Sequence, residues 1–181
     1  MSWYPATVTV AAASEPISLD EARTHARWDG STDNDTALAL YIASARAYVE
    51  KYCGTALVTR TVTVKCDSFD DFAVFPLAPL SSVSSVSYVD TAGATQTLST
   101  DVYEVRIDGL DASIVLKYGQ SWPGIQSGSR ITVTAVLGYS AIPSDIKHAL
   151  LILVAQGDNE REAAFAGVHD LLANHRIYVG T

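Results

Sequence analysis

The feature that most constrains the fold is the spacing of apolar residues, which changes twice along the chain. Between Leu38 and Tyr52, apolar side chains recur at steps of three and four residues, as on one face of a helix. From Leu57 to Leu137 the spacing falls towards two, and Val, Thr, Ser and Tyr predominate, as in strands. Helical spacing returns after Pro143, a residue that suits a first helical turn. The chain is therefore predicted to have an α+β fold, with a mostly antiparallel β module inserted between the second and third helices of a small helical bundle.

The helix ends carry signals of their own. Ser18 and Glu21 form a capping box, in which each side chain bonds a free backbone N–H, so a first helix is predicted over about residues 19–28. The second helix is predicted to end at Gly54, because glycine readily adopts the backbone conformation that stops a helix. The third helix is apolar all round over residues 149–155, so we expect it to be buried on more than one side.

These patterns divide the chain into five segments. Pro5 and Pro16 bracket the first segment, and Gly167 separates the last one from the third helix. The five are an N-terminal extended arm (1–15), the first part of the helical core (16–56), the inserted β module (57–137), the last core helix (138–166) and a C-terminal tail (167–181).

Composition limits the partners that the chain can have. Its 181 residues are 48% hydrophobic, enough to build a core, but only 18% are charged. Globular domains usually have about 25% charged residues, so part of this surface is predicted to be neutral and covered by neighbours. A net charge of −8 argues against tight binding of nucleic acid, which requires clustered Lys and Arg.

The small number of cysteines and the lack of a targeting signal predict a soluble protein made in a reducing compartment. Cys53 and Cys66 are too few for a disulfide scaffold and are predicted to be free thiols. The N-terminus lacks a basic region followed by an apolar run, as a signal peptide would have. The longest apolar run, residues 149–155, is too short to span a membrane.

The stretch "GQSWPG", residues 119–124, raises the question of catalysis, because Ser121 lies between glycines. A nucleophile elbow requires a strand before the serine and a helix after it, but here Pro123 follows and no helical pattern begins. The stretch is instead predicted to be a structural turn, in which Gly119 and Pro123 set the bend and Trp122 anchors it. No catalytic residue is assigned, and we expect that the protein is not an enzyme.

Metal and cofactor sites are not predicted either. The histidines have no pair at the i, i+4 spacing that metal-binding helices often use, and the acidic clusters lack the register of a calcium loop. The histidines are His25, His148, His169 and His175, and the acidic residues are Asp29, Asp33, Asp35, Asp67, Asp70 and Asp71. Capping and solvated turns explain the acidic residues better.

Several segments together resemble the tailed-phage head–tail connector (adaptor) family, which includes the adaptors of gene transfer agents. The resemblance runs in order over roughly residues 15–178. It is carried by "EPISLDEARTHARWDG", "YIASARAYVEKYCGTALVTRT", "PLSSVSSVSYVD", "YGQSWPG", "ITVTAVLGY", "PSDIKHALLILV" and "LLANHRIY". Where the family often continues its third helix into an aromatic-rich segment, this chain has Gln156-Gly157-Asp158.

The resemblance implies a structural protein with no cofactor. Its subunits would form a ring, expected to be dodecameric, at the head–tail junction of a virion that is assembled in the host cytoplasm. One side of the ring would meet the portal protein and the other a stopper or tail-completion protein. DNA would pass through the channel without specific binding. The alternative is a monomeric α+β interaction module that binds a protein or a glycan through its β module.

The resemblance also implies that the tail docks on the portal and becomes ordered there. The alternative for this segment is that it folds back on its own helical core. The residues predicted to dock are Leu171, Leu172, His175, Arg176, Ile177 and Tyr178.

Overall fold

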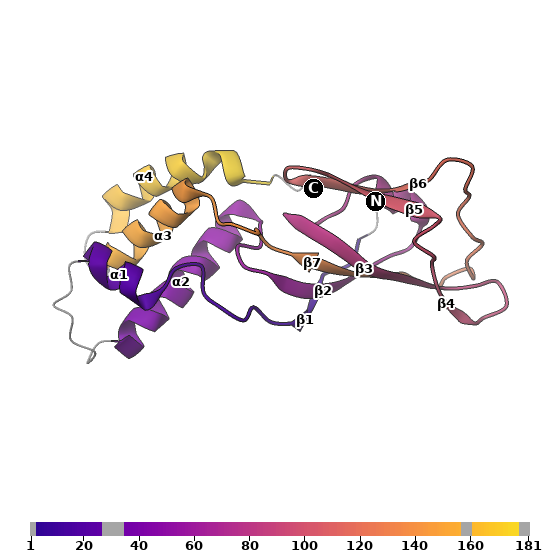
Figure 1. Cartoon of the computed structure of the whole chain (residues 1–181), viewed down its shortest axis with the longest axis horizontal. Helices are drawn as coiled ribbons and strands as arrows, with labels where there is room; N and C mark the ends of the chain where they lie inside the picture. The colour runs from indigo at the N-terminus through magenta and orange to yellow at the C-terminus, as the bar shows by residue number, and fades with distance from the viewer. Residues whose placement is uncertain (1–2, 27–34, 157–160, 178–181) are drawn as a thin grey trace. The chain divides into compact units, whose positions relative to one another are not determined.

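The computed structural model describes residues 3–26, 35–156 and 161–177. The chain divides into two compact units, a helical unit formed by residues 13–58 and 140–181 and a β unit formed by residues 1–12 and 59–139. Helices and antiparallel strands are both present, which confirms the α+β fold (Figure 1).

The helical unit is organised around one helix, α3, which packs against three others. Lys147 of α3 donates a hydrogen bond to Glu21 of α1, and the Ser18–Glu21 capping box is present, with the Ser18 N–H 2.9 Å from Glu21 Oε2. Ile146, Ala149 and Leu150 of α3 are fully buried. The described elements are α1 (Leu19–Ala26), α2 (Asp35–Cys53), α3 (Ser144–Gln156), α4 (Arg161–Leu172) and the 3-10 turn η3 (Ala173–His175).

The predicted boundary at Gly167, between one last core helix (138–166) and the tail (167–181), is wrong, because the structure has two helices there, α3 and α4. Helix α4 continues through Gly167 to Leu172. Val168 and Leu172 lie four residues apart, so they share one helix face, and both are fully buried. Burial of that face outweighs the roughly 1 kcal/mol that a glycine costs inside a helix.

The β unit contains one five-stranded antiparallel sheet in the order β1-β2-β7-β3-β4, together with a separate two-stranded hairpin, β5-β6. The central strand β7 alternates as its sequence predicts, with Ile131, Val133, Ala135 and Leu137 buried. The strands are β1 (Thr7–Val10), β2 (Arg60–Cys66), β3 (Leu80–Val89), β4 (Thr95–Thr97), β5 (Tyr103–Asp108), β6 (Asp111–Leu116) and β7 (Ile131–Leu137).

The N-terminal segment is extended, as predicted, but its first part belongs to the β unit. Strand β1 pairs with β2 through Thr7↔Thr63 and Val8↔Val62. Ahead of it, the Trp3 indole N–H donates to the Val74 carbonyl at 3.0 Å. These contacts hold residues 3–10 in place. The sequence of this segment predicts only that it is not helical, because its apolar residues lack helical spacing.

An aromatic cluster connects two loops of the β unit, the turn at residues 69–73 and the loop at residues 117–130. The 3-10 turn η2 (Phe69–Ala73) presents Phe69 and Phe72, and its first turn is capped by Ser68. The Trp122 ring stacks on Phe69 at 4.8 Å between centroids and meets Phe72 edge-on at 5.6 Å. Trp122 therefore ties the 117–130 loop to η2.

Trp122→Ala should destabilise the protein, because it removes both ring contacts from this cluster. Trp122 is only half-buried, so we expect a loss of about 2 kcal/mol, below the roughly 3–5 kcal/mol typical of a fully buried Trp. Trp122→Phe should retain most of the stability. Ser121→Ala is the matched control and should leave the urea midpoint unchanged, because Ser121 is exposed. A loss of stability in Ser121→Ala equal to that of Trp122→Ala would contradict this role for the loop.

Both cysteines are free and fully buried, which confirms the prediction of free thiols. Burial raises the pKa of Cys53 to about 11 and that of Cys66 to about 12. At neutral pH both thiols are therefore protonated and hidden from solvent, and a thiol in that state is a poor nucleophile.

Neither thiol of the native protein should react with iodoacetamide at pH 7.5, whereas both should react in denaturant. Intact mass after timed alkylation measures this. Ser99→Cys, which places a thiol at an exposed position of the β unit, is the positive control and should add one label quickly. Rapid labelling of Cys53 or Cys66 in the native protein would show that its segment opens readily.

Candidate functional site

The predicted docking tail (167–181) is described as far as Ile177, and this C-terminal segment, residues 168–177, lies against its own helical unit. Val168 and Leu172 bury one face of α4. After Leu172 the chain makes the turn η3 and becomes extended at Arg176. Contacts from this segment reach both α2 and α3.

His175 connects the segment to the first turn of α3. Its Nε2 lies 2.6 Å from Oδ2 of Asp145, and Oδ1 of Asp145 accepts the N–H of Ile146 at 3.0 Å. Desolvation opposes ionisation of Asp145, but these hydrogen bonds outweigh it and hold the pKa of Asp145 below its ordinary value. The C-terminal segment thus stabilises the ionised carboxylate of Asp145 through His175.

A stack of rings connects the segment to α2. The His169 ring lies parallel to the Tyr52 ring at 4.4 Å between centroids, and the Tyr48 hydroxyl is 2.7 Å from His169 Nε2. The Arg176 guanidinium lies 4.8 Å from the centroid of the Tyr52 ring, within cation–π range. Tyr52 therefore contacts the segment at two positions that are seven residues apart.

The backbone of the segment caps α2. The Ile177 N–H donates to the carbonyl of Cys53, the last residue of α2, at 2.8 Å. The carbonyls of the last helical turn have no partner within a helix, so this bond satisfies one of them. Gly54 follows with φ +71°, the left-handed conformation expected of the residue that stops a helix.

The predicted docking residues are therefore not equally available to a second protein. Leu172 is fully buried in the helical unit, whereas Leu171, His175 and Ile177 are half-buried and Arg176 is exposed. Tyr178 lies outside the described residues. As far as Ile177, the structure has the alternative arrangement, with the segment folded on its own helical core. The four-residue spacing of Val168 and Leu172 is the sequence signal that could have indicated it.

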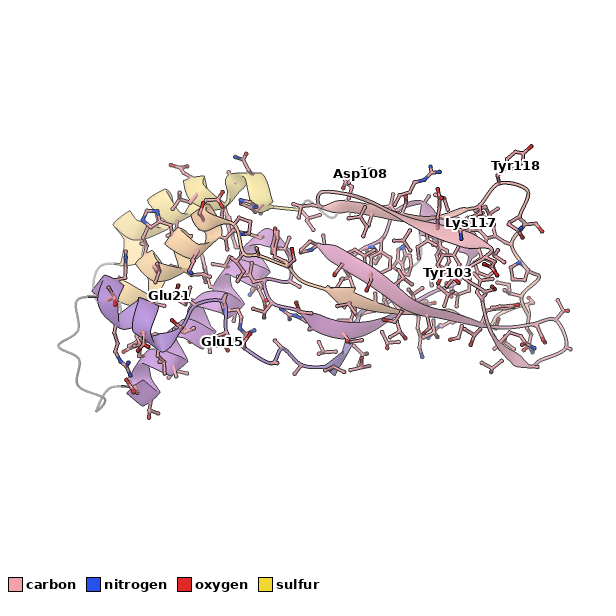
Figure 2. The ribbon with its side chains drawn as sticks, viewed as in Figure 1. Glu15, Glu21, Tyr103, Asp108, Lys117 and Tyr118 are labelled. Atoms are coloured by element: carbon pink, nitrogen blue, oxygen red, sulfur yellow. The ribbon has the colours of Figure 1, made fainter. Side chains whose placement is uncertain are left out.

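The second predicted site, the turn at residues 119–124, lies in an exposed loop after β6. Gly119 has φ +76°, a conformation that L side chains rarely adopt, and Ser121 is exposed beside it. Figure 2 shows Tyr118 projecting from the same loop, and its side chain is wholly exposed. His169 and His175, whose rings bond to Tyr48 and Asp145, belong to the helical unit, whereas Ser121 belongs to the β unit.

The described residues also bear on metal binding and on membrane insertion. No group of three or more His, Cys, Asp or Glu side chains there is arranged to hold a metal ion. None of the helices in the described part of the chain has the length and apolar character needed to cross a membrane.

The Asp145–His175 contact should make the stability of the protein depend on pH. Because the folded state lowers the pKa of Asp145, its carboxylate stabilises the fold above the ordinary Asp pKa of about 3.9. That contribution is lost as the pH falls through the lowered value. Asp145→Asn should therefore lower the urea midpoint at pH 7, and the difference from the parent should shrink below about pH 4. Asp111→Asn, at an exposed position of β6, is the control. A difference that is the same at every pH would contradict the assigned role.

Comparisons with known proteins agree with the resemblance that the sequence shows. The family model of phage gp6-like head-tail connector proteins matches residues 16–88, which extend from α1 to β3. No curated protein matches the sequence.

Three solved structures of gene transfer agent (GTA) particles contain similar chains, each with 98% coverage of both chains. One is the neck of an empty particle computed with C6 symmetry (24% identity, TM-score 0.79). Another is the virion of the native particle (23%, 0.77), and the third is the neck of the native particle computed with C12 symmetry (22%, 0.74). At these identities the likeness shows a shared fold over almost the whole chain. The family match over residues 16–88 confirms the predicted resemblance to the head–tail connectors.

Proposed function

We propose that this chain is a structural head–tail connector of a tailed phage or of a gene transfer agent particle. It forms a ring below the portal, at the head–tail junction of the virion, and joins the DNA-filled head to a stopper or tail-completion protein. The observation that carries the proposal is the similarity of this chain, over 98% of its length, to chains of gene transfer agent particles. The family match over residues 16–88 supports it independently.

The composition suits a ring of identical copies. A ring requires two different faces on each subunit that meet head-to-tail and close on themselves. Such faces remove neutral surface from water, and only 18% of this chain is charged. The C12 symmetry of one similar neck supports a dodecamer. Each copy carries a net charge of −8, so a ring of them repels phosphates, and DNA passes without being held.

Docking on the portal is assigned to the exposed end of the C-terminal segment. Arg176 is exposed and follows a segment that η3 and His175 hold in place. Its planar guanidinium can form a bidentate bond with a portal carboxylate. Ile177 adds a half-buried apolar side chain next to Arg176, and Tyr178, outside the described residues, is of a type enriched at interface hot spots. Leu172 is left out of this surface because it is buried in the helical unit.

The role is structural and not enzymatic. The matched family consists of connector proteins, and the one serine that the sequence offered as a nucleophile lies in an exposed loop. The stacking of Trp122 on Phe69 supports a structural role for the 119–124 turn.

Arg176→Glu should weaken binding of the purified chain to purified portal rings by about tenfold or more, because it reverses the charge that faces the portal carboxylate. Arg106→Glu, which makes the same charge change at an exposed position of β5 in the other unit, is the matched control and should bind normally. Surface plasmon resonance at two salt concentrations measures both. Loss of the Tyr52 contact alone costs about 0.5–1 kcal/mol of stability, so the melting temperature must be recorded alongside. Equal binding by both variants would remove Arg176 from the docking surface.

Cryo-electron microscopy of particles that contain this chain tests the proposal as a whole. A ring of density for the chain between portal and tail is the expected result. Density for the chain anywhere else in the particle would overturn the proposal.

A further inference from the structure

The five-stranded sheet of the β unit has two open edges. In the order β1-β2-β7-β3-β4, strand β1 bonds only to β2, and β4 bonds only to β3. No strand of the described residues pairs with the outer side of either one. Each edge therefore presents backbone N–H and C=O groups that another strand could use.

Neither edge strand carries a charged residue or a Pro, although both strands are short and β1 has a register shift between Val8 and Val10. Edge strands of soluble proteins are commonly protected by Lys, by other charges or by Pro. Here β1 reads "TVTV" and β4 reads "TQT", and all seven residues are exposed. Val8 and Val10 are 51% and 59% exposed, which adds apolar surface to the β1 edge.

The turn before β4 is ordered by the Asp90 carboxylate. It accepts the N–H groups of Ala92 and Ala94 at 2.9 Å, and the Gln96 side-chain amide at 2.8 Å. These bonds lower the pKa of Asp90, so its carboxylate is ionised at neutral pH. The strands β1 and β4 themselves carry no charged side chain, so a second copy can approach either strand without meeting a charge on the strand itself.

Strand direction decides how two copies can join. Every neighbouring pair in the sheet is antiparallel. With an odd number of strands, the two edge strands run in the same direction. The β1 edge of one copy can therefore lie beside the β4 edge of the next as a parallel pair, and the match is close in length, since β1 has four residues and β4 three.

We propose that the outer edge of β1 pairs with the outer edge of β4 in the next copy of this chain, so that the sheets join head-to-tail around the ring. The proposal rests on the proposed connector function and specifies one of its subunit contacts. The two edges are different surfaces, as a heterologous contact requires. Closure of the ring would leave no sheet edge open, which removes the risk of edge-to-edge aggregation.

Charge substitutions at the two edges test the pairing in rings assembled on purified portal. Val8→Lys and Thr97→Glu should each reduce the number of copies bound per portal, measured by native mass spectrometry. The reason is that each one places a charge in a neutral strand pair. The double variant Val8→Lys/Thr97→Glu should recover at least half of the lost occupancy, because it brings opposite charges to the two strands of the contact. Ser84→Lys, at an exposed position of the interior strand β3, is the control and should assemble as the parent does. Unchanged assembly of both single variants would overturn the pairing.

Cross-linking gives a second readout that does not depend on assembly efficiency. The double variant Val8→Cys/Gln96→Cys, treated with a short bis-maleimide on portal-bound rings, should give a ladder of multimers in a denaturing gel. Each single-cysteine variant should remain monomeric. The native Cys53 and Cys66 are buried and do not interfere. Dimers formed by Val8→Cys alone would show that β1 pairs with β1 of a twofold-related copy, and the proposal would be wrong.

The outcomes separate this proposal from the one on which it rests. Rings of the parent chain on the portal, without a ladder from the double-cysteine variant, would overturn the edge pairing and leave the connector function standing. Failure of the parent chain to bind portal rings at all would overturn both.

Discussion

The pairing of β2 with β7 is the contact on which the β unit depends. The chain leaves the helical unit at residue 58 and returns to it at residue 140. The pair Arg60↔Leu137 places the two ends of this insertion opposite each other, and the pairing continues to Cys66↔Ile131. Because the entropy cost of closing a loop grows slowly with its length, a long insertion is tolerated once its ends are held together. Strand β7 also pairs with β3, so it is bonded along both sides.

The C-terminal segment combines a structural role with the role proposed for it in docking. Val168 and Leu172 are buried in the helical unit, the Ile177 N–H caps α2, and His175 bonds to Asp145 at the start of α3. These contacts restrict the motion of Arg176 before any partner arrives. Binding through a segment that is already ordered loses less conformational entropy than binding through a free tail.

The low charged fraction of the chain bears on the assembly proposed for it. Only 18% of the residues are charged, and several charged side chains are engaged locally, such as Arg46 with Glu15 and Glu50. The strand edges β1 and β4 carry no charge at all. An acidic protein of this kind stays soluble through its net charge, while its uncharged strips remain able to contact another copy.

Local patterns in the sequence determined the kinds of element and much of their extent. The capping box at Ser18 and Glu21, the alternation along β7 and the helical spacing in α2 all depend on residues only a few positions apart, so they could be read directly. Tertiary structure alone decided which distant segments meet. The pairing of Thr7 with Thr63, the stacking of Trp122 on Phe69 and the bond from Ile177 to Cys53 join residues far apart in the chain. The continuation of α4 through Gly167 has the same origin, because burial of Val168 and Leu172 outweighs the low helix propensity of glycine. The free energy of such contacts comes from burying surface and satisfying backbone groups between remote segments, and the local spacing of residues does not record which segments those are.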